Sequence, residues 1–122
     1  MKLFRIWLEL ARSKDRPDGD PHHGYEFVAP LDANGHLDAA GWHEVKGACM
    51  VRRFVAGQDD QNGRLAHRGK TWIFDYDDAD TSDDEPVFKL DRHTVKLGEY
   101  LSITEHDGVT RTFKVANVRP LA

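Results

Sequence analysis

The chain has 122 residues, a formal net charge of −4 and a single cysteine, Cys49. This length fits one domain that buries roughly two thirds of the surface of its unfolded chain, and one cysteine excludes an internal disulfide. The apolar run at the N-terminus is interrupted by Glu9, and no segment reaches the length of a membrane span. We therefore expect one domain over residues 1–122, in the cytoplasm and not in a membrane.

The charge is distributed unevenly along the chain. Seven of the 21 acidic residues fall between Asp75 and Glu85, so 14 acidic residues remain against 17 basic residues. The body of the protein is therefore mildly basic, while one segment is strongly acidic. This small basic excess is far from the concentrated positive charge of nucleic-acid-binding proteins, which argues against a nucleic-acid partner.

The first half of the chain predicts strands around one short helix. Residues 1–10 alternate as a strand does, although a helical stripe also fits them. Residues 12–24 hold two prolines and two glycines and predict a loop. A strand over residues 25–31 and a turn over residues 32–35 follow. A helix is expected over residues 39–46, with Asp38 as its N-cap and Gly47 as its terminating residue.

The middle of the chain predicts three further strands. Residues 48–55, ACMVRRFV, are typical of a buried strand in which Cys49 is a small core residue. Residues 64–68 and 71–76 predict a hairpin across Gly69-Lys70, in a register that pairs Leu65 with Phe74. A short strand is expected over residues 87–90, after the acidic segment.

The segment from Thr94 to Arg119 predicts a long β-hairpin. Asp107-Gly108 fits a two-residue turn, but that register places the apolar residues of the two arms on opposite faces of the hairpin. A three-residue loop, His106-Asp107-Gly108, keeps them together and pairs Leu101 with Phe113 and Ile103 with Arg111. We therefore expect the three-residue loop, with Gly108 in the left-handed conformation.

Two residues of this hairpin do not fit the alternation. Val118 falls on the wrong face, which predicts a bulge near Ala116-Asn117. Glu99 shares the face of the apolar residues, so we expect its charge to point toward the core and to pair with Arg52 or Arg53. About seven strands with short polar turns predict a mainly β fold, a small antiparallel β-barrel or barrel-like sandwich with one short helix.

Arg52 and Arg53 are the clearest candidates for a buried charge. Adjacent residues of a strand point to opposite faces, so one of the two approaches the interior and needs a carboxylate partner. Asp75 and Asp77 extend a predicted strand and could be that partner. Such a pair either orients a loop or forms part of an anion site, in which guanidinium groups hold a carboxylate or phosphate.

Metal and catalytic motifs are not found in the sequence. Asp18, Asp20, His22 and His23 offer ligands, but adjacent histidines point in different directions and no HExxH spacing occurs. The acidic segment lacks the glycine and terminal glutamate of a calcium loop. Nucleophile elbows, phosphate loops and CxxC pairs are also missing. We expect no metal and no cofactor.

The expected function is a non-enzymatic binding module for a small anionic ligand or a protein partner. Its candidate ligand-binding residues are His23, Tyr25, Arg52, Arg53, His67, Arg68, Asp75, Asp77 and Glu99. The first alternative is a small metal-dependent or acid/base enzyme, which requires residues 22–25 and 75–77 to converge. The second is single-stranded nucleic-acid binding on a barrel face, which requires Arg52 or Arg53, Arg64 and Arg68 to lie beside exposed aromatic rings.

Five segments, HGYEFVAPLDANGHLD, VRRF, WIFDYD, DDE and GEYLSI, resemble a family of short bacterial proteins of unassigned function. The resemblance implies a bacterial cytoplasmic protein with a single small domain. It implies no activity and no catalytic residue.

Overall fold

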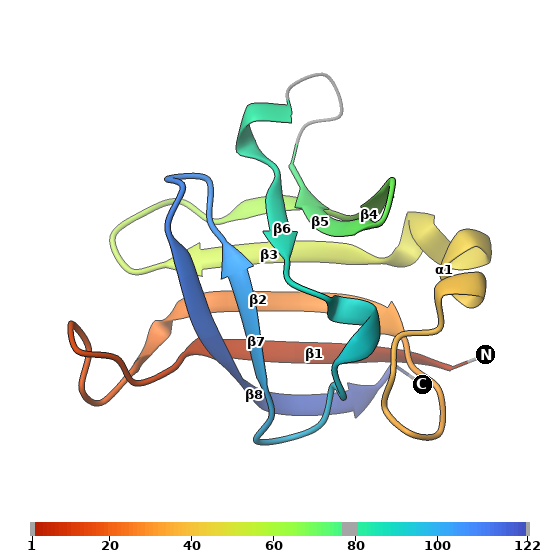
Figure 1. The fold of residues 1–122 in the computed structure, drawn as a ribbon, viewed down its shortest axis with the longest axis horizontal. Helices are drawn as coiled ribbons and strands as arrows, with labels where there is room; N and C mark the ends of the chain where they lie inside the picture. Colours follow the sequence, from red (N-terminus) through yellow and green to blue (C-terminus); the bar gives the residue numbers. More distant parts are fainter. Residues whose placement is uncertain (1, 77–80, 122) are drawn as a thin grey trace.

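The computed structural model describes residues 2–76 and 81–121 and contains a closed barrel of eight antiparallel strands. Each strand pairs with the next in sequence, and β1 pairs with β8, so the sheet has no free edge (Figure 1). The elements are β1 (Leu3–Leu10), β2 (Asp20–Pro30), α1 (Ala39–Val45), β3 (Met50–Val55), β4 (Gln61–Arg68), β5 (Thr71–Asp75), β6 (Glu85–Val87), β7 (Tyr100–Thr104) and β8 (Thr110–Pro120). The mainly β prediction is confirmed, with eight strands where about seven were expected.

The helix α1 and the hairpin of β4 and β5 form as the sequence predicts. The Asp38 carboxylate accepts a hydrogen bond from the Gly41 amide and caps the helix, which continues into a 3-10 turn over Lys46–Ala48. Leu65 pairs with Phe74 across a turn in which Gly69 has a φ of 60°. Among the described residues, no helix has the length and apolarity that a membrane-spanning helix needs.

The predicted loop over residues 12–24 is too long. β2 begins at Asp20, and its pairing with β1 shifts between Gly24, opposite Glu9, and Asp20, opposite Leu10. The strand therefore continues through a bulge, which accommodates the proline and glycine that indicated a loop. A Cβ atom on Gly24 would lie 1.9 Å from the Leu8 carbonyl oxygen, so glycine is needed there for the close approach of β1.

The C-terminal hairpin has the register that the parity of its apolar residues predicts. Leu101 pairs with Phe113, and Ile103 with Arg111. Gly108 has a φ of 84°, and its amide donates to the Glu105 carbonyl at 2.8 Å, which closes the three-residue loop. The bulge near residue 116 is also confirmed, because β1 pairs Trp7 with Asn117 and Leu8 with Val115, which leaves Ala116 without a partner.

The first arm of this hairpin is shorter than predicted. Gly98, with a φ of 88°, forms a turn before β7 begins at Tyr100. The alternation of the strand therefore does not extend back to Glu99, which is exposed, nor to Leu97, which is 71% exposed. The prediction that Glu99 points toward the core and pairs with Arg52 or Arg53 is wrong. The short strand predicted over residues 87–90 lies earlier in the chain than expected. β6 spans Glu85–Val87, and Leu90 lies in a 3-10 turn.

The interior of the barrel changes character along its axis. The middle is apolar, with Phe27, Phe74 and Phe113 fully buried. We call one end the polar end; its buried or half-buried residues are His23, Tyr25, Arg53, Tyr76, Glu85, Glu105 and Arg111, and the exposed His106 lies at its rim. We call the other the aromatic end; it holds Trp42 of α1, His67, Trp72 and Leu90.

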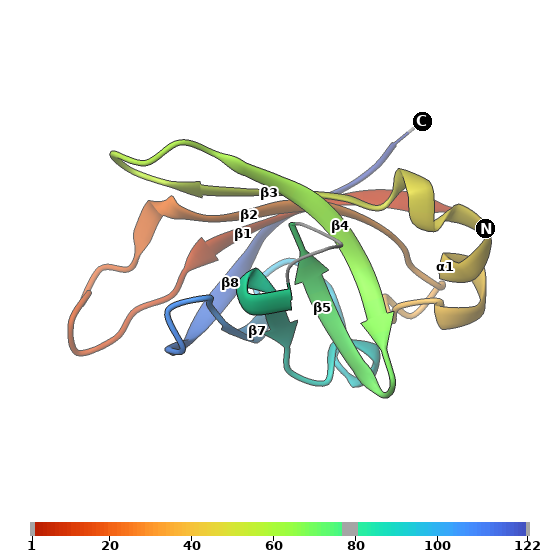
Figure 2. The same ribbon diagram turned by 90° about the horizontal axis from the view of Figure 1, so that it is seen from above.

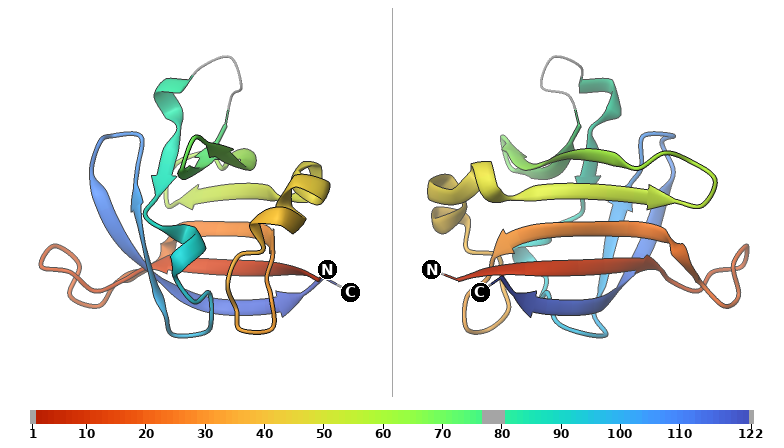
Figure 3. Two further views of the ribbon diagram at one scale, coloured as in Figure 1. Left: turned by 45° about the vertical axis from the view of Figure 1, so that its right-hand side comes forward. Right: turned by 180° about the vertical axis from the view of Figure 1, so that it is seen from behind.

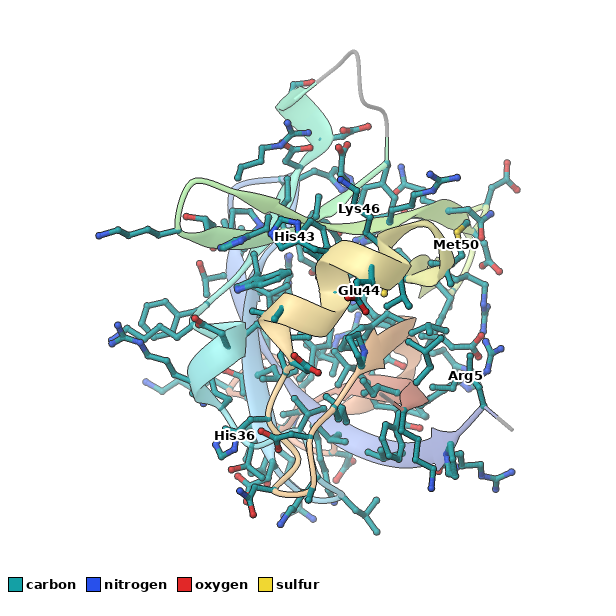
Figure 4. All side chains as sticks on the ribbon, turned by 90° about the vertical axis from the view of Figure 1, so that its right-hand side faces the viewer. Arg5, His36, His43, Glu44, Lys46 and Met50 are labelled. Atoms are coloured by element: carbon teal, nitrogen blue, oxygen red, sulfur yellow. The ribbon has the colours of Figure 1, made fainter. Side chains whose placement is uncertain are left out.

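The views of the ribbon show the two ends apart. α1 lies on one side of the barrel, and the β1–β2 loop and the β7–β8 turn lie on the other (Figures 1 and 2). From behind, β3, β2, β1 and β8 lie side by side as one continuous surface (Figure 3). Figure 4 turns the α1 side toward the viewer and shows His43 and Glu44 on the helix and Lys46 directly after it; all three side chains are exposed.

Candidate functional site

The polar end arises because several inward-facing rows of apolar residues finish on a polar residue. In β7 the inward row is Leu101 and Ile103, and Glu105 continues it one step beyond the strand. In β3, Arg53 follows Val51 on the same face. Each polar side chain therefore points into the barrel because of the same alternation that buries its apolar neighbours.

Glu105 is the centre of this cluster and its side chain is fully buried. Its carboxylate accepts hydrogen bonds from the Tyr25 hydroxyl at 2.6 Å and from Arg53 Nε and Nη2 at 3.1 and 3.0 Å, and His23 Nε2 lies 3.0 Å from both its oxygens. Arg111 Nη1 donates to it at 2.8 Å. Burial alone would raise the pKa of Glu105, but the hydrogen bonds from His23 and Tyr25 and the nearby positive charges outweigh burial and hold this pKa at about 2.

Glu85 is the second fully buried carboxylate of the polar end. Its Oε1 accepts from the Tyr76 hydroxyl at 2.7 Å and from the Tyr25 hydroxyl at 3.0 Å. Its Oε2 accepts from the His106 amide at 2.9 Å and lies 3.1 Å from His106 Nδ1. Burial, and then the charge of Glu85, raise the pKa of Tyr76 well above its ordinary value, so this hydroxyl stays protonated and donates.

Tyr25 connects the two carboxylates. Its hydroxyl contacts Glu85 and Glu105 but carries one proton, so it donates fully to only one of them at a time. Burial and both carboxylates raise the pKa of Tyr25, which keeps that proton in place. His106, Glu85, Tyr25, Glu105 and His23 therefore form a continuous chain of polar contacts across the polar end.

The two adjacent arginines of β3 point to opposite faces, as predicted. Arg53 is 8% exposed and lies inside the barrel. Arg52 lies outside, where its guanidinium pairs with Glu26 and Asp60 and lies over the rings of Trp7 and Phe54. Among the described residues the inward arginine is bound by Glu105 and by Glu85, at 3.5 Å, and neither Asp75 nor Glu99 is its partner.

Asp75 pairs with Arg68 instead. Arg68 Nη2 lies 2.5 Å from Asp75 Oδ2, and its Nε lies 3.1 Å from Asp84 Oδ2. Carboxylate oxygens of Asp75, Asp83 and Asp84 lie within 4.8 Å of one another, and burial, followed by the charge of Asp75, raises the pKa of Asp84. Arg68 supplies positive charge to this acidic group. The candidate Asp77 lies outside the described residues.

The eight candidate residues that the structure describes are thus divided among separate places. His23, Tyr25 and Arg53 meet at the polar end, whereas His67 stacks on Trp72 at the aromatic end, with ring centroids 4.0 Å apart. Arg52 and Glu99 lie on the outer surface, and Arg68 and Asp75 form their own pair.

Sequence reasoning missed several members of the polar end. These are Tyr76, Glu85, Glu105, His106 and Arg111. The predicted hairpin register already contained the signal for Glu105, because it follows Leu101 and Ile103 at spacing two. The segments around His23 and Asp75 do converge, but they do so through Tyr25 and Tyr76, which share Glu85. The metal candidates of residues 18–23 do not gather into a group of ligands among the described residues.

An open hollow of about 470 Å³ lies at the polar end, between the β1–β2 loop and the β7–β8 hairpin. Its ionisable lining consists of Arg12, Asp15, Arg16, His23 and Arg111. His23 and Arg111 form its wall toward the barrel and are held by Glu105. The hydrogen bond from Arg111 to Asp107, and then the charge of Glu105, outweigh the effect of burial and raise the pKa of Arg111. The lining of the hollow therefore carries three permanently charged arginines and one aspartate; Arg16 and Arg111 are also paired with carboxylates outside the lining.

Comparison of the chain with protein-family models found no match, and comparisons with curated proteins and with solved structures found none either.

Proposed function

We propose that this protein is a binding module for a small anionic ligand, which it holds in the hollow at the polar end. One observation carries this proposal: three arginines and a histidine line the hollow against a single aspartate, Asp15. Guanidinium groups bind carboxylates and phosphates with paired, charge-assisted hydrogen bonds. A small carboxylate or phosphate compound is therefore the ligand class that fits.

The wall of the hollow retains donors after its internal contacts are made. Arg111 uses both N–H groups of Nη1 and one of Nη2 on Glu105 and Asp107, which leaves Nε and one N–H of Nη2. His23 meets Glu105 through Nε2, so Nδ1 is left for a ligand, to which it donates when the ring is protonated. Glu105 thus fixes the direction of two groups that would otherwise be free to turn, which lowers the entropy cost of binding.

The loop adds charge from the opposite side. Arg12 is exposed and forms no ion pair among the described residues, while Arg16 lies 3.7 Å from Asp20. Backbone and side-chain hydrogen bonds between Ser13 and Arg16 close a turn in the loop segment that carries the two arginines. An anion in the hollow would therefore be contacted by the arginines of the loop on one side and by Arg111 and His23 on the other.

A second candidate is acid/base chemistry at the same hollow. The observation that favours it is the His23–Glu105 pair at the wall, because a buried carboxylate that orients a histidine is a common arrangement of general bases. If the ligand is recovered chemically unchanged, the protein binds it without catalysing a reaction; a changed ligand would indicate catalysis. Analysis of the recovered ligand by mass spectrometry makes that distinction.

Thermal unfolding with added inorganic phosphate, malonate and citrate tests the binding proposal. A ligand at one hundred times its dissociation constant stabilises the folded protein by about 2.7 kcal/mol. We expect at least one of these anions to raise the unfolding temperature, and Arg12→Gln combined with Arg16→Gln to abolish the rise. Lys96→Gln is the matched control, since it removes one positive charge from an exposed site outside the hollow. Equal shifts in the double variant and in the control would contradict the proposal.

We include a cytoplasmic location in the proposal, supported by the single cysteine, Cys49, which is buried and free. A bacterial source is supported only by the resemblance of the five segments described above.

A further inference from the structure

The aromatic end contains a buried hydrogen-bond donor that has no acceptor. Trp72 is 2% exposed, and its Nε1–H has no hydrogen-bond partner in the described part of the chain. The other two tryptophans differ: Trp7 Nε1 donates to Glu9 at 3.2 Å and Trp42 Nε1 donates to the Leu65 carbonyl at 3.0 Å. A buried N–H without an acceptor is costly and rare in folded proteins, so this indole calls for a physical explanation.

A second hollow lies beside this indole. It has a volume of about 470 Å³ and is formed by the β4–β5 turn, by β6 and by the 3-10 turn over Leu90–Arg92. Trp72 is part of its wall. The hollow is separate from the one at the polar end, with which it shares no lining residue.

The rim of this second hollow is basic. Lys70, Lys89 and Arg92 line it against one carboxylate, Asp91. Among the described residues none of these three cations takes part in an ion pair, whereas Arg53 and Arg111 of the polar end are paired. Three unpaired cations around a hollow attract an anion.

Lys89 also has an unusual backbone conformation. Its φ of 48° makes it the one non-glycine residue with a positive φ among those described. A lysine in this conformation costs free energy and is held there by its surroundings. Its ammonium group lies 5.0 Å from the ring centre of Phe88, which is 56% exposed beside the hollow. A basic group and an exposed aromatic ring are thus presented together.

We propose that this hollow binds a small aromatic carboxylate. The carboxylate would accept the Trp72 Nε1–H and pair with the basic rim, and the ring of the ligand would contact Phe88. The Trp72 indole is covered by His67, which stacks on it at an interplanar angle of 5°. His67 lines the same hollow and makes no hydrogen bond among the described residues, so moving it would break ring contacts but no hydrogen bond; Trp72 Nε1 is itself fully buried, so the carboxylate reaches it only after such a movement.

Two-dimensional ¹H–¹⁵N NMR of the whole protein, titrated with benzoate, tests this site. The three tryptophans give three indole signals, and Trp72→Phe identifies that of Trp72. We expect benzoate to move the Trp72 signal downfield and saturably, while the signals of Trp7 and Trp42 stay in place. Benzamide, which has the same shape without the charge, should leave all three unchanged.

Charge variants provide the second arm of the test. Lys89→Gln and Arg92→Gln should each weaken benzoate binding about tenfold, as expected for loss of a charge-assisted hydrogen bond. Lys96→Gln, outside the hollow, should leave the affinity unchanged. The site would be refuted by an unmoved Trp72 signal at saturating benzoate, by an equal response to benzamide, or by equal affinities in the rim variants and the control. Arg12→Gln with Arg16→Gln should not alter benzoate binding, so this test is independent of the proposed function.

Discussion

The two ends of the barrel close the same apolar interior in different ways. The polar end is filled by two buried glutamates whose oxygens are satisfied by tyrosine, histidine and arginine donors. The aromatic end is filled by rings in edge and stacked contacts, including Trp42 against Trp72 at 5.1 Å. The difference teaches that burial of a side chain at a barrel end does not require an apolar residue, provided that each polar atom finds a partner.

The comparison also separates what stabilises the fold from what serves function. Well-packed apolar residues often stabilise a protein as well as a buried ion pair does, because burying charges costs desolvation free energy. The aromatic end is closed by such apolar packing. A barrel end can therefore be closed without buried charges. The buried charges at the polar end are consistent with a role for Glu105 in orienting His23 and Arg111 at the hollow.

Removal of Glu105 should give the largest effect. Glu105→Ala leaves the Arg53 guanidinium buried with only its longer contact to Glu85, and we expect a loss of about 3 to 5 kcal/mol in the free energy of unfolding. Urea unfolding measures this loss. Glu99→Ala, at an exposed carboxylate, is the control and should change stability little. A small effect of Glu105→Ala would show that the polar end does not stabilise the barrel.

Acid should weaken the polar end next. The folded-state pKa of Glu105 is about 2, below its ordinary value of 4.5, so its contribution is fully present above about pH 5 and is lost as the pH falls toward 2. The shift corresponds to about 3 kcal/mol. Urea unfolding at pH 7 and at pH 2.5 should therefore show a larger loss in the wild type than in Glu105→Gln. Parallel losses in the two proteins would contradict the assignment to Glu105.

A smaller effect is expected at the aromatic end. Trp42→Phe keeps most of the ring but removes the donor to the Leu65 carbonyl, at a cost of about 1 to 2 kcal/mol. The lost hydrogen bond has no ionisable partner, and phenylalanine keeps an aromatic ring beside His43 and His67, so this cost should change little between pH 7 and pH 2.5. Trp7→Phe, on the outside of the barrel, provides the matched substitution and should cost less. A strongly pH-dependent cost of Trp42→Phe would contradict the expected difference between the two ends.

From the sequence, the strand register near the polar end could be predicted better than the set of side chains that meet there. Parity gave the register of the C-terminal hairpin, the bulge at Ala116 and one inward arginine, because each depends on local alternation. Glu105 lies in the same alternation and was accessible to it. Glu85 was not, because it ends a run of acidic residues, and composition alone cannot show which of them enters the barrel.

Other errors have equally local causes. A turn at Gly98 ends the alternation that placed Glu99 in the core, and a bulge in β2 turns a predicted loop into strand. The partners of Arg53 come from strands distant in sequence, so only the closed barrel brings them together. Pairings of this kind depend on tertiary structure and carry no local signature.

NMR of the histidine side chains during titration with inorganic phosphate tests the central proposal, that the hollow at the polar end binds a small anion. His23 lines the hollow there, whereas His43 lies exposed on α1 at the opposite side. We expect the imidazole signals of His23 to move saturably at constant pH and ionic strength, those of His43 to remain in place, and Arg12→Gln with Arg16→Gln to remove the response. Unmoved His23 signals, or equal movement of both histidines, would contradict it.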